Sequence, residues 1–266
     1  MIRKYIPLLA AIGLIALGWV IYAKTREKLP EPAPRAEASE VTAATTQTGD
    51  TTRYSSGFSD RAHAVLPDGT RMILNPNTEV LVPKPSWDTS YIRVNGDAYL
   101  VFPQVKGKSF ITLTKDLILT SLDGGQAFRI SSFDKDEGES VEVLNGTVTA
   151  TKAYSSKDNE PEHLNGGDMV MINRSIDLME KETFDSTTLR TWVDDRLVFQ
   201  NASMDTVIHQ LQDWFGITVD VSGNPDDAPN VTESFTNAGL EEVLDALSKT
   251  YHCKYTIGKY TAQLAF

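Results

Sequence analysis

The side chains that could do chemistry are few and lie far apart in the sequence. The four histidines, His63, His163, His209 and His252, show neither the His-x-x-x-His spacing nor the nearby glutamate of a zinc site. Cys253 is the single cysteine, so the chain by itself can form no disulfide and no cysteine-rich metal site. We expect a buried, inert thiol there. These residues predict no metal centre.

The carboxylates and tryptophans also point away from catalysis. Acidic residues cluster at 134–137 and 180–182, where we expect solvated loops rather than paired catalytic carboxylates. The sequence has no Gly-x-Ser-x-Gly elbow, phosphate loop or dinucleotide fingerprint. Trp87, Trp192 and Trp214 could form a carbohydrate platform, but isolated tryptophans are typical of core or domain-junction packing. We therefore expect a protein that is not an enzyme, with no catalytic residues and no cofactor.

The charge of the chain bears on its partners. Its 266 residues include 36 acidic and 25 basic side chains, a formal net charge of -11. A field of this sign repels nucleic acid, so we expect no nucleic-acid partner. Hydrophobic residues make up 41% of the chain, which is enough to build a folded core.

The N-terminal segment predicts a membrane anchor. Tyr5–Ala23 contains 19 residues without a charge, close to the about 20 that span a bilayer as a helix. A cleaved signal peptide would have a shorter apolar region and small residues before the cut, where Ile21 is too bulky to fit well. Residues 1–23 are therefore expected to form a short cytoplasmic end and one transmembrane helix.

A linker is expected to follow at residues 24–52. Pro30, Pro32 and Pro34 occur there among Ala, Glu and Thr, and almost no large apolar residue follows Leu29. Such a segment cannot bury a core. We expect a stalk that is extended at the prolines and flexible beyond them.

Residues 53–188 predict an all-β domain. Runs of strand length and β-forming composition alternate with glycine-containing turn signals, which supply the positive φ angles of tight hairpins. Tyr91–Val94 and Ala98–Phe102, for example, are expected as two strands on either side of Asn95-Gly96. The five signals are Pro67-Asp68-Gly69, Asn95-Gly96, Asp123-Gly124-Gly125, Asn145-Gly146 and Asn165-Gly166-Gly167. We expect about a dozen short strands in a sandwich or a solenoid-like stack of hairpins, with no helix between them.

Residues 189–266 contain an internal repeat. The segment 199–211 is echoed by 235–247 at an offset of 36 residues, so that Phe199 matches Phe235 and each copy continues into an amphipathic helix. The apolar stripes are Met204, Val207, Ile208, Leu211 and Phe215 in one copy and Leu240, Val243, Leu244, Leu247 and Tyr251 in the other. Strands are expected to return at 217–221 and 254–257, with a last strand at 260–266. The pattern predicts an α+β domain of two βαβ repeats, with both helices on one face of a small sheet.

In order along the chain, several segments resemble the motifs of one known family. They are Leu66-Pro67-Asp68-Gly69-Thr70, Val94-Asn95-Gly96-Asp97-Ala98-Tyr99, residues 143–148 and 164–168, residues 192–199, and Trp214-Phe215-Gly216. Together they resemble the extracytoplasmic part of FecR-family anti-sigma-factor regulators, in the Bacteroidetes form with an appended C-terminal STN-like domain. Gln126 and the missing proline of the last turn depart from the family pattern, so the loops there are expected to differ.

The resemblance implies a place and a set of partners. It implies a single-pass inner-membrane protein whose periplasmic domains bind a TonB-dependent outer-membrane transducer to control an extracytoplasmic-function sigma factor. Family regulators carry a cytoplasmic helical domain before the span, where this sequence offers only residues 1–4. The sigma factor would then be held by a longer product or through another chain. The alternative is a receptor-binding or envelope-scaffold protein without sigma-factor control.

The same resemblance makes residues 197–266 the expected docking module. Two small sheets can join through exposed edge strands, with the backbone supplying the hydrogen bonds. The candidate interface residues are Val231, Thr232, Glu233 and Phe235, because their strand follows the Pro/Asp-rich loop 224–229. A core role for Phe235 stays open, since its equivalent Phe199 fits a packing position.

Overall fold

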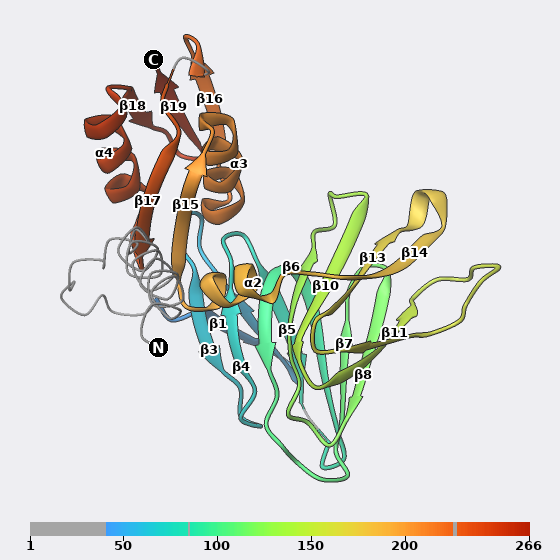
Figure 1. Ribbon diagram of the computed structural model, residues 1–266. Coiled ribbons are helices and arrows are strands. Elements are labelled where there is room, and N and C mark those ends of the chain that lie inside the picture. The colour runs from blue at the N-terminus through green and yellow to red at the C-terminus, as the bar shows by residue number, and fades with distance from the viewer. Residues whose placement is uncertain (1–40, 85, 226–227) are drawn as a thin grey trace, which may run out of the picture. The chain divides into compact units, whose positions relative to one another are not determined.

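The computed structural model describes residues 41–84, 86–225 and 228–266 (Figure 1). These residues belong to one compact unit of the chain, 35–266. The expected membrane helix at 5–23 lies outside the described residues. Within the described part, every helix is too short or too polar to cross a bilayer.

The first part of this unit is a domain of fourteen strands joined in one sheet. The strands are β1 (Ala44–Thr48), β2 (Thr51–Ser55), β3 (Ala62–Val65), β4 (Arg71–Leu74), β5 (Glu79–Pro83), β6 (Thr89–Val101), β7 (Ser109–Leu113), β8 (Leu117–Leu122), β9 (Ala127–Ser132), β10 (Gly138–Asn145), β11 (Thr147–Lys152), β12 (Glu162–Asn165), β13 (Asp168–Asn173) and β14 (Leu178–Thr183). A single 3-10 turn, η1 (Arg174–Ile176), precedes β14. The β-rich composition expected for this region is confirmed.

Strand β6 corrects the expectation of a turn at Asn95-Gly96. The strand runs unbroken through both residues, pairing with β5 and β7 in its first part and with β4 and β9 in its second. Gly96 has a φ of 133°, and a Cβ there would lie 2.6 Å from the Cα of Thr78. Glycine is required here because the strand bends against a neighbouring backbone, not because the chain reverses.

Three of the other turn signals join strands that are not paired with each other. Residues 123–125 lead from β8 to β9, residues 145–146 from β10 to β11, and residues 165–167 from β12 to β13. Each of these links crosses from one half of the sheet to the other, where one half contains the strands on the β5 and β7 side of β6 and the other half those on the β4 and β9 side. Only residues 67–69, among the five predicted signals, close a hairpin, between β3 and β4. Positive φ angles let the backbone turn, but the partner of each strand is set by the core.

Both halves of the sheet face one hydrophobic core. Phe110 of β7 and Phe128 of β9, one from each half, are both almost fully buried. Phe102 lies between them, with ring centroids 5.0 Å from Phe110 and 5.5 Å from Phe128. The sheet therefore folds over itself around a shared core, as in a sandwich, rather than forming a stack of independent hairpins.

Two segments differ from the expected division of the chain. Strand β1 lies inside the segment expected as linker, and it pairs with β2 along its whole length. Helix α2 (Ser186–Val193) spans the expected boundary at 188, with Asp185 as its N-cap. Leu189 and Trp192 of α2 pack on Tyr99 and Ala127 of the sheet. This helix was not expected, because only two large apolar residues mark its buried face.

The C-terminal domain follows the predicted repeat closely. Its elements are β15 (Arg196–Ala202), α3 (Met204–Phe215), β16 (Thr218–Ser222), β17 (Val231–Thr236), α4 (Leu240–Tyr251), β18 (Lys254–Ile257) and β19 (Thr261–Ala265). The expected single sheet is wrong: β15 and β17 form one sheet, and β16, β19 and β18 form another. Both helices share one core with strands of both sheets. Each βαβ repeat thus begins in one sheet and ends in the other (Figure 1).

The two repeats also share their backbone details. Asn201 and Asn237, which are 36 residues apart, both adopt left-handed backbone angles, with φ values of 49° and 52°. Both helices end on a left-handed residue, Gly216 in α3 and His252 in α4. The repeat in sequence is therefore a repeat in backbone conformation, including the position that asparagine tolerates best after glycine.

Candidate functional site

The four expected interface residues all lie on β17, but they do not share one environment. The Val231 side chain is fully buried in the core, so it is not available to a partner. Phe235 is partly buried and packs against the same core, with its ring 6.1 Å from that of Phe199. Thr232 is exposed and Glu233 is half-buried. The side chains that a partner could reach on this strand are therefore those of Thr232 and Glu233.

The outer edge of β17 is partly occupied. Strand β17 pairs only with β15 among the described strands. A hydrogen bond between the Thr232 backbone and the Tyr251 hydroxyl works against burial, which raises the pKa of Tyr251. Tyr251 of α4 thus lies beside the Thr232 backbone.

Other strands of this domain offer comparable edges. The three-stranded sheet has β16 and β18 at its margins, and β18 is exposed along most of its length. Ile257 of β18 and Val221 of β16 are large apolar residues exposed to 45% and 37%. Sequence patterns could not rank these edges, because exposure of an edge depends on which strands pair across the two repeats.

A buried arginine lies where the β domain meets the C-terminal domain. Arg61, just before β3, donates hydrogen bonds to Asp195 (2.5 Å) and to the carbonyl of Trp192 (3.0 Å). Its guanidinium lies 3.9 Å from the ring centroid of Trp192 and 4.9 Å from that of Trp214 in α3. Burial lowers the pKa of Arg61, and Asp195 acts in the opposite direction. This is a cation held between two tryptophans and paired with one carboxylate.

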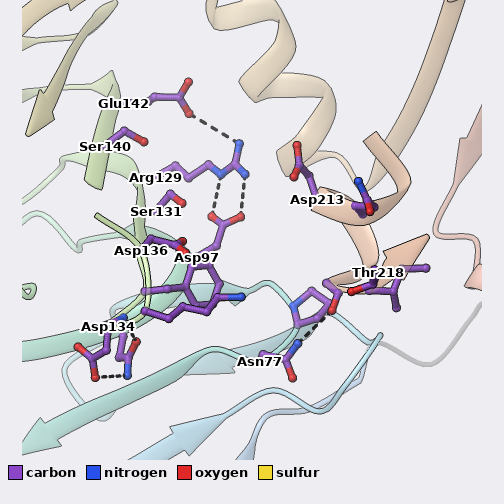
Figure 2. Close-up of a pocket in the computed structure, with 17 residues that line it drawn as sticks. Asn77, Asp97, Arg129, Ser131, Asp134, Asp136, Ser140, Glu142, Asp213 and Thr218 are labelled. Carbon is purple, nitrogen blue, oxygen red and sulfur yellow. Dashed lines mark hydrogen bonds and ion pairs between the residues drawn. The ribbon is translucent and has the colours of Figure 1, made fainter. Parts of the chain in front are cut away.

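A second arginine extends the junction into a chain of polar contacts. Figure 2 shows Arg129 of β9 bound by two parallel hydrogen bonds, of 2.8 and 2.7 Å, to the carboxylate of Asp97 in β6. Asn75 donates from one amide nitrogen to Asp97 (2.9 Å) and to the carbonyl of Asp213 at the end of α3 (3.1 Å). The contacts therefore run from the face of the sheet opposite its core, where Tyr99 packs on α2, to a helix of the C-terminal domain.

A cleft of about 820 Å³ opens beside this network (Figure 2). Its lining includes Asp97, Asp134, Asp136, Glu142 and Asp213 as carboxylates, against only two basic side chains. Burial raises the pKa of Glu142, and Arg129, 3.8 Å away, acts to lower it. The cleft is polar and negative, so it favours cations over anions.

The remaining chemical candidates take structural positions. Cys253 is buried, and burial raises the pKa of its thiol, which makes it less reactive. Within the described ranges, no group of three or more His, Cys, Asp or Glu side chains is placed to hold a metal ion. The acids at 134–137 lie in a loop as expected, whereas residues 180–182 lie on the exposed strand β14.

The packing expectation is right for two of the three tryptophans. Trp192 and Trp214 pack at the domain junction, as predicted, but Trp87 is 91% exposed. Their arginine partners, Arg61 and Arg129, were not singled out. No local pattern marks them, because the two lie 68 positions apart on different strands or loops and meet only through the fold.

Family models match both folded parts of the chain. The model described as FecR protein matches residues 52–149, and the model described as FecR, C-terminal matches residues 196–262. Together they cover more than half of the sequence. A search of curated proteins finds no match to this chain.

Solved structures share the fold. Two crystal structures of a protein from Parabacteroides distasonis ATCC 8503, provisionally named an anti-sigma factor, align with a TM-score of 0.57 and 23% identity. One alignment covers 81% of this chain and 98% of the other, and the second covers 80% and 97%. With both domains matched by family models in the expected order, this chain belongs to the FecR family of regulators.

Proposed function

We propose that this regulator is a membrane-anchored signal relay whose periplasmic domains bind a TonB-dependent outer-membrane transducer to control an extracytoplasmic-function sigma factor. Membership of the FecR family supports a signal-regulatory role. The observation that carries the finer proposal is a C-terminal domain with open-edged strands, joined to the β domain through a cation-π and ion-pair junction.

Docking would use the backbone of an open edge. A strand added to β17 would extend the β15–β17 pair, with Thr232 and Glu233 as the side chains within reach. Helix α3 contacts β15, and its last turn carries Asp213 and Trp214 to the junction. A partner on this domain would therefore be mechanically linked to the β domain. The junction would then pass the binding event toward the N-terminal anchor.

Site-specific photocrosslinking in cells tests the docking step. A photoreactive residue replaces Thr232 on β17, Thr256 on the rival edge β18, or Thr147 on β11 of the other domain as a control, all three being exposed. We expect a covalent adduct with a TonB-dependent transducer, identified by mass spectrometry, at position 232 and none at positions 256 and 147. An adduct with that protein only at position 256 would move the site to β18, and none at either position would overturn the docking proposal.

A variant sharpens the same test. Thr232→Pro removes one backbone N–H donor of β17 and also the hydroxyl that accepts a hydrogen bond from the Asn201 N–H of β15 (3.1 Å). For this variant the photoreactive residue replaces Glu233, which is half-buried on the same strand. We expect an adduct from position 233 in the parent chain and its loss in Thr232→Pro, in protein that a urea unfolding curve shows to be folded. Undiminished crosslinking of the folded variant would contradict docking through this edge.

Transcript profiling tests the regulatory step. Deletion of the gene should change the transcripts of one extracytoplasmic-function sigma regulon, and the parent chain should restore them. Thr232→Pro should fail to restore the response to the inducing signal. If no sigma-dependent transcript changes, regulation is refuted and the receptor-binding or scaffold role remains.

A further inference from the structure

An apolar groove lies on the face of the β sheet opposite its core, beside helix α2. It has a volume of about 650 Å³, and Val193 of α2 forms one side. Its floor consists of two rows of side chains across β3, β4 and β6, with His63, Ile73 and Tyr99 in one row and Val65, Arg71 and Val101 in the other. Val65 is 67% exposed, so apolar surface remains open to solvent there.

The chain enters the folded unit at the margin of this groove. Val41 is the first residue that the structure describes. The next residue, Thr42, belongs to the groove lining and forms a bridge with His63 of β3. His63 donates its N–H to the carbonyl of Val41 (2.8 Å), and its own carbonyl accepts from the N–H of Ala43 (2.9 Å). The six residues before Val41 are therefore attached at the groove itself.

The groove carries positive charge in an otherwise acidic protein. Arg71 of β4 and Arg190 of α2 are both exposed, and neither has an ion-pair partner in the described part of the chain. Burial raises the pKa of Tyr99 on the groove floor. The charges that act on the Tyr99 hydroxyl are those of Arg190 and Arg71, which work to lower that pKa.

The carboxylates close to the groove do not cancel this charge. Asp194 is exposed and follows Val193; it is the one carboxylate, within the described ranges, that is next in sequence to a lining residue. Asp97 and Asp195 lie two positions from the lining, but each is bound to an arginine of the domain junction. Two cations thus stand against one carboxylate.

We propose that this groove binds residues 35–40 of the same chain. The segment reads Arg-Ala-Glu-Ala-Ser-Glu, with two carboxylates against one arginine. Glu37 and Glu40 complement the charges of Arg71 and Arg190, and the two alanines supply small apolar side chains for the floor. The inference goes beyond the proposed function, since it requires neither a transducer nor a sigma factor.

Reach and tethering favour this occupant over a separate molecule. Six extended residues span about 20 Å, whereas β3 and β6 are two strand spacings apart, about 10 Å. A segment tethered this closely has an effective concentration on the order of millimolar. Contacts too weak to hold a free peptide can therefore hold this segment. While it is bound, a protease or a partner that needs residues 35–40 must first displace it.

Disulfide crosslinking in the full chain tests the proposal. In a Cys253→Ala background, Ala38→Cys is combined either with Val65→Cys in the groove or with Asp60→Cys as the matched control. Asp60 is exposed and lies three residues from His63, in the direction opposite to Val65. Under mild oxidation we expect an intramolecular disulfide to form about tenfold faster with position 65 than with position 60, at a rate independent of protein concentration. Equal rates, or a faster reaction with position 60, would overturn the proposal.

Charge variants separate docking from chance encounters of two tethered thiols. Arg71→Ala and Arg190→Ala should each lower the ratio of docked to free segment, and with it the crosslinking rate at position 65, by about two- to fivefold. Lys157→Ala, at another exposed cation, should change nothing. Rates are compared among variants whose urea unfolding curves match that of the parent chain. A crosslinking rate indifferent to both arginines would contradict the charge pairing on which the proposal rests.

Photocrosslinking in cells identifies the occupant directly. A photoreactive residue replaces Val65, and the crosslinked peptides are mapped by mass spectrometry after digestion with trypsin, which cuts after Arg35 and Arg53. We expect a link from position 65 to residues 36–40 of the same chain. The same photoreactive residue at Ile176, which is 68% exposed outside the groove, should give no such link. A link from position 65 only to residues 41–53, or only to another protein, would refute docking of this segment.

Discussion

The two repeats of the C-terminal domain have the same backbone conformation, but the ends of their helices have different surroundings. In the first, the last turn of α3 brings Asp213 and Trp214 to the β domain, through Asn75 and Arg61. The second copy has Lys249 and Thr250 at these positions, and the Lys249 side chain is 79% exposed.

The difference shows how a repeated βαβ unit can build a shared core in both copies and contact the neighbouring domain through the helix end of only one. The apolar stripes, which build the shared core, recur in both helices. The residues at the helix ends differ, and there one copy is committed to the neighbouring domain while the equivalent surface of the other remains exposed. Paired substitutions at equivalent positions can test this division.

The largest difference is expected at the equivalent phenylalanines. Phe199→Ala removes a fully buried ring and should lower the free energy of unfolding by about 3–5 kcal/mol. Phe235→Ala removes a partly buried ring and should cost about half as much. Urea unfolding of the two variants measures both values. Equal costs would show that the two copies contribute equally to the core.

The junction should depend on one copy alone. Trp214→Ala removes the ring that packs on Arg61, on the C-terminal core and on the junction cluster of Leu189 and Trp192, and should lower the free energy of unfolding by about 2–4 kcal/mol. Thr250→Ala, at the equivalent exposed position, should stay within about 0.5 kcal/mol of the parent. Chemical denaturation checks both. A comparable loss from Thr250→Ala would refute the idea that the second helix end is unused.

The two helix C-caps should respond in opposite directions. Gly216 has a φ of 61°, and an added Cβ would lie 2.9 Å from Pro76, so Gly216→Ala should cost about 2 kcal/mol or more. His252 holds a φ of 56° without being glycine, so His252→Gly should stabilise the chain by about 0.5–1 kcal/mol. Thermal unfolding of the two variants shows whether each one stabilises or destabilises the chain. If His252→Gly destabilised the chain, the contacts of the imidazole would contribute more to stability than the left-handed backbone of His252 costs.

The smallest effect concerns a hydrogen bond present in the second copy only. Tyr255 of β18 donates its hydroxyl to Asp245 of α4 (2.6 Å), and this raises the pKa of Tyr255 to about 12. Since the folded pKa lies above the ordinary value of 10.0, the stabilisation is complete below pH 10 and is lost as pH rises through 12. Val219 occupies the equivalent position in the first copy.

Absorbance titration of the phenolate measures this effect. Tyr255→Phe should remove one titration near pH 12, and Asp245→Asn should move it toward the ordinary value. The phenolate of Tyr255 appearing near pH 10 in the parent chain would show that the bond to Asp245 does not persist in solution.

The sequence was most informative where structure depends on local periodicity. The stripe from Met204 to Phe215 and its echo 36 residues later predicted both helices at their observed bounds, because an amphipathic helix has one way to bury its apolar face. The sequence also indicated which metal sites to expect, because isolated histidines and a single cysteine provide too few ligands for a histidine- or cysteine-rich site. Family motifs spread over both domains predicted the membership that the family models now show.

Tertiary structure decided what the sequence left open. Asn95-Gly96 has the composition of a hairpin turn but lies within β6, because Thr78 packs against the glycine and the strand continues into the other half of the sheet. Arg61 and Trp214 meet across 153 positions of sequence. Turn residues and apolar stripes are local requirements of the backbone and so can be read along the chain. Strand partners, ion pairs and the exposure of Trp87 depend on which surfaces the core brings together, and only the folded chain determines that.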